Sequence, residues 1–226
     1  MDTIPATPAD STRHPVKHPP LSPAFISADD AARWAHEAIG RRRDVEYGGV
    51  ILKRGSRYYA TQPIPDRRMV FDHGLLLAKD SEGNFIAPEG YVAEAFYHSH
   101  PADAVQIRAM FPSFTADQAQ LFNNFYSTAD QLFSFRNRAF AKSHYFSGPD
   151  SVLLKYVSSG SSAEKTYGQK LLAGTVEPSS DFESPVRNLA EVGELWVLIA
   201  NAVWGGVRGR VTKGWRMNTP VTTSGG

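Results

Sequence analysis

The alternation of apolar and polar residues along the chain predicts a mixture of helices and strands. A first helix is expected over residues 28–43, because Ser27 supplies an N-cap and apolar residues then recur at helical spacing. Two β-prone runs, 45–52 and 57–64, are separated by a loop whose composition suits a hairpin. A third run, 91–97, alternates as a half-buried strand does.

The second half of the chain continues this mixed pattern. Residues 114–135 carry two short helical repeats of apolar residues, with a break near Asn123 and Asn124. The remaining expected elements are a hairpin of 139–146 and 152–157, a helix over 162–172, a loop over 174–184 and a helix over 189–204. Together the elements predict an α/β (α+β) fold in which helices flank a mixed β-sheet.

Residues 195–204 form the most apolar stretch of the chain. The stretch is far shorter than the roughly 20 apolar residues that span a bilayer, so we expect a core or docking helix here. A helix at a membrane interface or at a partner-binding surface is the alternative. It is suggested by the basic segment that follows, which contains Arg208, Arg210, Lys213 and Arg216.

The N-terminal residues 1–26 are rich in proline and lack the apolar run of a secretory signal peptide. Such a segment buries too little apolar surface to offset the entropy of ordering, so we expect a disordered leader. A folded domain over 27–174 is expected to follow it. Residues 175–226 are expected to form a loop, the apolar helix and a basic, flexible tail.

Composition narrows the chemistry that the chain can perform. It has 226 residues, of which 42% are hydrophobic, and this is enough for a core of its own. Its 24 Lys and Arg residues against 23 Asp and Glu residues leave a net charge of +1, so no nucleic-acid partner is expected. Because the sequence has no cysteine, a metal would have to be held by His, Asp or Glu side chains.

Two histidines stand at the end of a predicted strand. His98 and His100 are two residues apart, so strand alternation puts both imidazoles on the same side of the sheet, where they can converge on one ion. Pro101 then ends the strand. A purely structural role is the alternative, since a His-x-His sequence also arises by chance in a chain with 7 histidines.

Three segments, in order along the chain, resemble the JAMM signature of the JAB/MPN zinc metallopeptidases. They are Glu46-Tyr47-Gly48-Gly49-Val50-Ile51-Leu52, His98-Ser99-His100-Pro101 and Ser127-Thr128-Ala129-Asp130. The likeness covers about residues 28–158 and is greatest to bacterial JAMM-like domains found in polymorphic-toxin and effector proteins. It implies the cytidine-deaminase-like JAB/MPN fold and makes 27–174 a catalytic domain. It also implies a bacterial cytoplasmic protein, or an exported effector without a cleavable signal peptide.

The resemblance further implies which residues carry the chemistry. His98, His100 and Asp130 would bind Zn²⁺ and leave a fourth position for water, whose pKa the metal lowers. Glu46 would take a proton from that water, and Ser127 would donate a hydrogen bond to the developing oxyanion. The implied activity is hydrolysis of a peptide or isopeptide (amide) bond in a protein or peptide, such as a ubiquitin-like conjugate. The alternative is a non-catalytic JAMM-like binding or effector module.

The sequence departs from the usual signature in the spacing of the third ligand. Asp130 follows His100 by 30 residues, whereas typical members use a shorter connection. Asp117 is therefore a rival ligand, although Ser113 lies one residue too far from it for the Ser-x-x-Asp spacing. If Asp130 is the ligand, residues 102–125 form an insertion beside the site and are a candidate substrate lid.

Several of these residues also have an interpretation without catalysis. Glu46 would be an exposed strand carboxylate, and Ser127 would be the N-cap of the next helix. His73 and His144 are expected to be surface or packing residues. The glycine pair 48–49 would be a strand bulge, or a place where the backbone of a substrate approaches closely.

Overall fold

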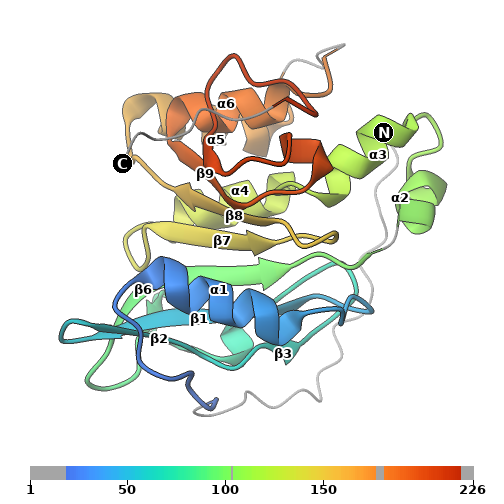
Figure 1. The fold of residues 1–226 in the computed structure, drawn as a ribbon. Helices are drawn as coiled ribbons and strands as arrows, with labels where there is room; N and C mark the ends of the chain where they lie inside the picture. Colours follow the sequence, from blue (N-terminus) through green and yellow to red (C-terminus); the bar gives the residue numbers. More distant parts are fainter. Residues whose placement is uncertain (1–18, 103, 177–180, 220–226) are drawn as a thin grey trace.

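A computed structural model describes residues 19–102, 104–176 and 181–219, and it has one large β-sheet with helices on both faces (Figure 1). The strands of this sheet are β1 (Tyr47–Arg54), β2 (Arg57–Ala60), β3 (Ile64–Pro65), β6 (Val92–Ser99), β7 (Ser143–Ser147), β8 (Leu153–Val157), β9 (Glu194–Ile199) and β10 (Gly209–Arg210). They run in the order β10-β9-β8-β7-β6-β1-β2, with β3 paired to β1. A separate small sheet pairs β4 (Ala78–Lys79) with β5 (Phe85–Ile86).

The sheet is mixed because β6 and β7 are parallel, whereas the other neighbouring strands are antiparallel. A parallel pair requires a long crossover between its strands. Here the crossover contains α2 (Ala104–Met110), α3 (Ala116–Asn123) and α4 (Thr128–Arg136). The predicted α/β class and the mixed sheet flanked by helices are thus confirmed.

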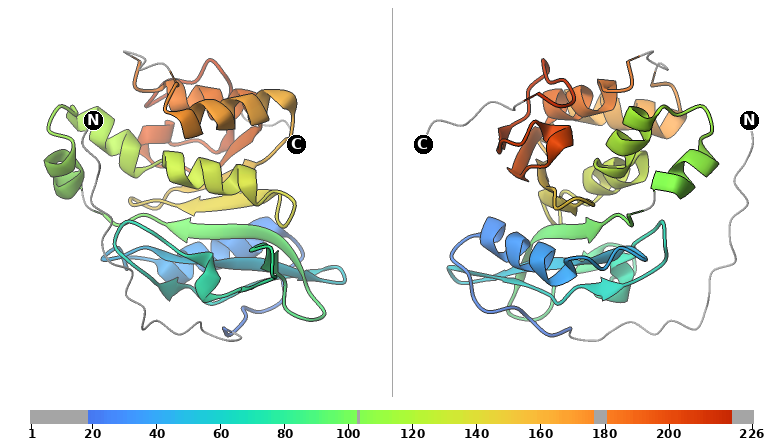
Figure 2. Two further views of the ribbon diagram at one scale, coloured as in Figure 1. Left: turned by 180° about the vertical axis from the view of Figure 1, so that it is seen from behind. Right: turned by 45° about the vertical axis from the view of Figure 1, so that its right-hand side comes forward.

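The helices divide between the two faces of the sheet (Figure 2). On one face lies α1 (Ala28–Ile39), which begins where the Ser27 side chain accepts a hydrogen bond from the Asp30 N–H. It ends at Ile39, four residues earlier than expected, because the C-cap Gly40, with a φ of 54°, takes the chain out of helical geometry. On the other face lie α4 and the segment that carries the 3₁₀ helix η1 (His73–Leu75), β4 and β5. Beside β8 and β9 lie α5 (Ser162–Ala173), α6 (Ser184–Val192) and the 3₁₀ helix η2 (Ala202–Trp204).

Strand alternation sorts the core residues between these faces. Tyr97 and Tyr145 are neighbours across the β6–β7 pair and pack in the cluster under α1. Phe96 and Phe146 point to the opposite face, where each belongs to a different buried cluster. His98 has the same parity as Phe96, so it also faces the side of the sheet that α4 covers.

The predicted helix over 189–204 is wrong over most of its length. The helix α6 ends at Val192, Gly193 is its C-cap, and the apolar run continues as β9. Leu195 and Val197 are buried and alternate with more exposed neighbours, as a strand that pairs with β8 requires. A short apolar run is compatible with either a strand or a helix. Here it is a strand, because it pairs with β8 in the sheet. None of the helices in the described part of the chain combines the length and hydropathy that a membrane crossing needs.

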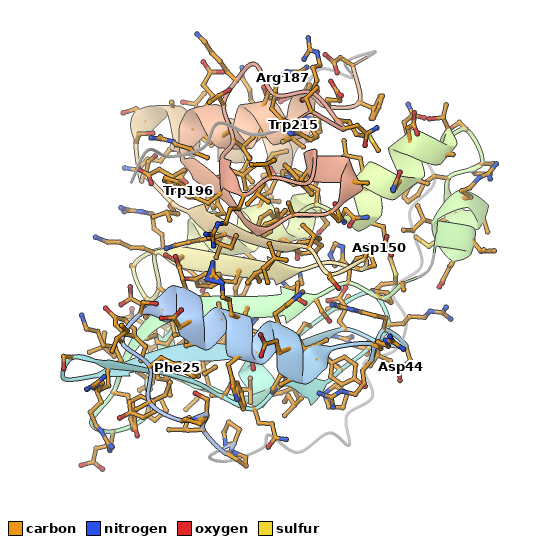
Figure 3. All side chains as sticks on the ribbon, viewed as in Figure 1. Phe25, Asp44, Asp150, Arg187, Trp196 and Trp215 are labelled. Carbon is orange, nitrogen blue, oxygen red and sulfur yellow. The ribbon has the colours of Figure 1, made fainter. Side chains whose placement is uncertain are left out.

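The expected disordered leader is wrong in its last part. Residues 1–18 lie outside the described residues, but residues 20–25 run along β2. The backbones of Phe25 and Tyr58 exchange two hydrogen bonds of 2.9 and 3.0 Å, and Ser22 N–H donates to the Ala60 carbonyl at 2.8 Å. Phe25 lies beside the sheet below α1 in Figure 3. This segment therefore adds one more stretch of paired backbone to the outer strand.

Candidate metal centre

The ends of β1 and β6 bring three of the predicted site residues to one face of the sheet. Gly48 pairs with His98 in the β1–β6 register, and directly opposite residues share a face. Glu46 lies two residues before Gly48, and His100 lies two residues after His98. The backbone of His100 is held by a hydrogen bond of 3.3 Å from its N–H to the carbonyl of Ser147 at the end of β7.

The fourth residue, Asp130, comes from the first turn of α4. The Asp130 N–H donates to Ser127 Oγ at 3.2 Å, and the Ser127 N–H donates to Asp130 Oδ2 at 2.7 Å. The Ser-x-x-Asp spacing is therefore a capping box, with Ser127 as the N-cap. This reciprocal pair holds the Asp130 carboxylate in a defined orientation. Capping does not remove Asp130 from the site, because the same carboxylate also faces the two histidines.

The side chains of His98, His100 and Asp130 converge tightly. His98 Nε2 lies 3.3 Å from Asp130 Oδ1, and His100 Nε2 lies 3.3 Å from Asp130 Oδ2. The three ligand atoms all lie within 4.8 Å of one another. Both histidines are buried and Asp130 is partly buried. These three residues form a group that could hold a metal ion.

The distances and the donor atoms fit such an ion. Around a tetrahedral ion with bonds of about 2.0–2.1 Å, neighbouring ligand atoms are about 3.3–3.4 Å apart, and each histidine nitrogen lies at this distance from one of the two Asp130 oxygens. His98 is buried, and its Nε2 faces the Asp130 carboxylate, so the two ligand atoms point into the same space. Two imidazoles and a carboxylate suit several divalent transition metals.

Asp117 does not take part in this group. It lies in the first turn of α3, is exposed, and is not among the residues whose ligand atoms converge. Its neighbour Thr115 forms a capping box with Gln118, so the sequence around Asp117 marks a helix start. Of the two candidate aspartates, the structure therefore brings Asp130 to the histidines.

The three residues also form a coupled electrostatic unit. Burial opposes charge on His98, but the adjacent Asp130 carboxylate outweighs it and raises the pKa of His98. Burial likewise disfavours the Asp130 carboxylate, yet His98 and His100 hold its pKa well below the usual range. Burial lowers the pKa of His100 despite the contact with Asp130. A carboxylate anion thus persists between two imidazoles, one of which is driven to take up a positive charge.

Glu46 is buried, not exposed as its alternative interpretation required. Its side chain is 5% exposed, and burial raises its pKa to about 8. His98 opposes this shift, while Asp130 and Asp66 add to it. Glu46 lines the same cavity as the two histidines, Asp130 and Ser127. Both backbone polar groups of Glu46 are hydrogen-bonded, because its N–H donates to the Arg67 carbonyl and its carbonyl accepts from the Asp66 N–H.

The cavity has a volume of about 240 Å³ and a largely apolar wall. Met69 and Phe71 come from the segment before η1, Ile107 from α2, Phe122 from α3 and Phe133 from α4. Part of the expected insertion 102–125 therefore borders the site, as its interpretation as a lid requires. Gln106 and Asn123 add polar groups to the wall besides Glu46, Ser127, the histidines and Asp130.

Two further histidines line the cavity without belonging to the group that could hold a metal ion, and His73 packs among aromatic rings as expected. His144 lies on β7, and its Nε2 is 2.8 Å from His98 Nδ1. His73 is buried in the cavity wall, where its ring stacks on Phe133 with a centroid separation of 4.8 Å. No sequence pattern marks either residue. His144 reaches the site only because β7 is parallel to β6, which pairs His144 with Phe96, two residues before His98.

The glycine pair 48–49 is neither a bulge nor an open surface. A Cβ at Gly48 would overlap the ring of Phe71, and one at Gly49 would overlap the Tyr97 hydroxyl and Thr61 Oγ1. The register shift in β1 instead falls between Ile51 and Leu52. The glycines are therefore required by packing, since aromatic rings occupy the space where side chains would stand.

Searches of protein-family models, of curated proteins and of solved structures return no match to this chain. The chemistry of the site therefore has to be argued from its own geometry.

Proposed function

We propose that the chain is a zinc-dependent hydrolase of the JAMM type, with the JAB/MPN fold, that cleaves a peptide or isopeptide bond. One observation carries the proposal. The His98, His100 and Asp130 ligand atoms lie within 4.8 Å of one another, in a cavity that also contains the buried carboxyl group of Glu46. The mixed sheet flanked by helices agrees with the fold that the sequence resemblance implies.

In this proposal His98, His100 and Asp130 are the protein ligands of zinc. Three ligands leave one coordination position open, which is the arrangement of catalytic zinc sites. When bound, zinc supplies Lewis acidity and lowers the pKa of water to about 7. The ligand group needs no thiolate, in keeping with a sequence that has no cysteine.

Glu46 is the general base and then the general acid. Burial keeps its carboxyl group protonated near neutral pH when no cation is nearby, with a pKa of about 8. A divalent charge in the adjacent ligand group would favour the carboxylate and lower that pKa toward neutrality. Glu46 would then accept a proton from the attacking water and deliver it to the leaving amine.

Ser127 is placed to act on the substrate carbonyl. Its Oγ accepts the hydrogen bond from Asp130 N–H, so its hydroxyl proton can be donated elsewhere. Ser127 lines the cavity together with Glu46 and the three ligands. A hydroxyl donor at this place would stabilise the oxyanion that develops as the amide carbonyl is attacked. The N-cap role of Ser127 and this catalytic role therefore use different atoms of the same side chain.

The test combines metal analysis with hydrolysis. Purified wild-type protein should contain one zinc per chain and should cleave members of a panel of fluorogenic peptides and lysine-linked isopeptides. Glu46→Gln should keep the zinc and lose the hydrolysis. Glu94→Gln is the matched control, because Glu94 lies on β6 but does not line the cavity, and it should keep both. Absence of zinc from the wild type, or undiminished hydrolysis by Glu46→Gln, would overturn the proposal.

A further inference from the structure

A chain of hydrogen bonds leads away from the ligand face of His98. His98 Nδ1 lies 2.8 Å from His144 Nε2, and His144 Nδ1 lies 2.7 Å from Ser134 Oγ. Ser134 Oγ in turn donates to the backbone carbonyl of Asp130 at 2.8 Å. The chain therefore starts on one candidate metal ligand and ends on the backbone of another. All three side chains are buried, at 2%, 2% and 6% exposure for His98, His144 and Ser134.

The hydroxyl proton of Ser134 determines which atom is the donor in each of these hydrogen bonds. A hydroxyl has one proton, and Ser134 donates it to the Asp130 carbonyl, which can only accept. Ser134 must then accept from His144, so the proton of His144 is on Nδ1. The imidazole tautomer that carries its proton on Nδ1 has an acceptor lone pair on Nε2. His144 Nε2 lies 2.8 Å from His98 Nδ1, so in this arrangement His98 donates from Nδ1 to His144 Nε2.

We propose that His144 and Ser134 are positioning residues that fix the His98 tautomer with its proton on Nδ1, which leaves the Nε2 lone pair for a divalent metal ion. This inference rests on the metal site of the proposed function. Metal-binding histidines commonly donate their second N–H to a partner that sets the ring orientation and raises the basicity of the ligand nitrogen. Here that partner is a second histidine, and the carbonyl of the Asp130 ligand residue anchors it.

Packing alone does not account for a histidine at position 144. The neighbours of its ring are aromatic, and Phe146 fills the next position on the same face of β7. A phenylalanine would bury apolar surface there, whereas an imidazole must have both nitrogens satisfied to avoid a desolvation cost. Both nitrogens of His144 have hydrogen-bond partners, which within the described part of the chain are His98 and Ser134. The His144 ring thus joins the candidate ligand His98 to Ser134 on the helix α4 through two hydrogen bonds.

The experiment measures zinc affinity with a chromophoric chelator as competitor. His144→Phe should weaken zinc binding by about 10–100-fold, the usual effect of removing a partner of a metal-bound histidine. Ser134→Ala should weaken it by a smaller factor, because His144 then has no acceptor that fixes its tautomer. His144→Gln should restore much of the affinity, since the glutamine amide oxygen can accept from His98 Nδ1.

Tyr126→Phe is the matched control. The Tyr126 hydroxyl donates to the backbone carbonyl of His144 at 2.6 Å, so this variant removes a buried hydrogen bond from the same residue without touching the imidazole. It should be destabilised like the other variants and bind zinc as the wild type does. If His144→Phe and Ser134→Ala also bind zinc like the wild type, the inference is wrong.

A second readout does not need the metal. Nitrogen-15 NMR of the metal-free wild type should show a proton on His98 Nδ1 and a scalar coupling across the hydrogen bond to a bare His144 Nε2. A proton on His144 Nε2 would overturn the inference even if zinc binds. If the coupling is present but the wild type binds no zinc, the proposed function fails while the tautomer assignment stands.

Discussion

The Ser99 hydroxyl accepts a hydrogen bond of 3.0 Å from the backbone N–H of Tyr47, and this bond joins the two strands that carry the candidate site. Ser99 stands between His98 and His100 on β6, and Tyr47 directly follows Glu46. The bond lies on the buried side of the sheet away from the cavity, and Ser99 is fully buried. It therefore helps to set the spacing between Glu46 and the two histidines from the opposite face of the sheet.

Replacement of Ser99 by alanine should reduce both stability and activity. The Tyr47 N–H would lose its partner, at a cost of about 1–3 kcal/mol in the free energy of unfolding. Zinc content should be retained while hydrolysis falls, because Glu46 is no longer held in register. Ser22→Ala is the matched control, since Ser22 Oγ accepts from the Ala60 N–H at 2.9 Å in the same way but far from the site. Equal activity losses in the two variants would argue against a positioning role for Ser99.

Asp130→Asn should abolish zinc binding without unfolding α4. The asparagine oxygen can still accept from the Ser127 N–H, so the helix start is preserved. The loss of zinc affinity should exceed the roughly 10–100-fold effect of a residue that only supports a ligand. Without the carboxylate, the pKa of His98 should also fall, which NMR titration of the metal-free protein can follow. Asp117→Asn is the control and should bind zinc normally, whereas a zinc defect in that variant would reinstate Asp117 as the ligand.

The metal-free protein should lose stability as the pH rises, and Glu46 should be one cause. Burial raises the pKa of Glu46 from 4.5 to about 8, so between these values the folded chain holds a proton that the unfolded chain has released. The stabilisation from this proton is complete below about pH 4.5 and is lost as the pH rises through about 8. Glu46→Gln removes this loss, so near pH 7 it should be more stable than the wild type by about 1–3 kcal/mol.

Denaturant unfolding at pH 5 and at pH 8, with chelator present, checks this prediction. The difference in unfolding free energy between Glu46→Gln and the wild type should be larger at pH 8 than at pH 5. A difference that is the same at both values would mean that Glu46 titrates normally in the folded state.

Gly49→Ala distinguishes packing from substrate contact at the glycine pair. Because a Cβ at this position overlaps Tyr97 and Thr61, the variant should lose about 1–3 kcal/mol of stability or more. Gly214→Ala is the control, since its nearest neighbour is Thr212 Oγ1 at 3.9 Å and an added methyl group is accommodated. Circular dichroism melts measure both. If Gly49→Ala melts like the wild type but hydrolyses substrate poorly, the glycine instead serves the substrate.

Much of the fold follows from local patterns in the sequence. The Ser27 cap predicted the start of α1, and alternation predicted the β6 strand that ends in the two histidines. The helix over 189–204 failed because its apolar run carries no period that separates a buried strand from a helix. Pairing with β8 decides that case, and such a contact between distant segments is invisible in local sequence.

The residues of the candidate site were likewise predictable only in part from the sequence. His98 and His100 could be paired from strand alternation alone, and the resemblance of Ser127 to Asp130 to the Ser-x-x-Asp signature pointed to Asp130, although the same spacing is a capping box in the structure. The choice of Asp130 over Asp117 needed the structure, since both follow helix-start signals. His144 could not be predicted, because its approach to His98 depends on the parallel pairing and register of β6 and β7.

Anomalous diffraction at the zinc edge, from crystals of the zinc-loaded protein, tests the metal centre most directly. The proposal predicts one zinc ion per chain, with His98 Nε2, His100 Nε2 and an Asp130 oxygen at about 2.0–2.2 Å and the Glu46 carboxylate facing the open coordination position. An anomalous peak elsewhere on the chain, or a zinc ion in this cavity with Asp130 turned away from it, would contradict the proposal.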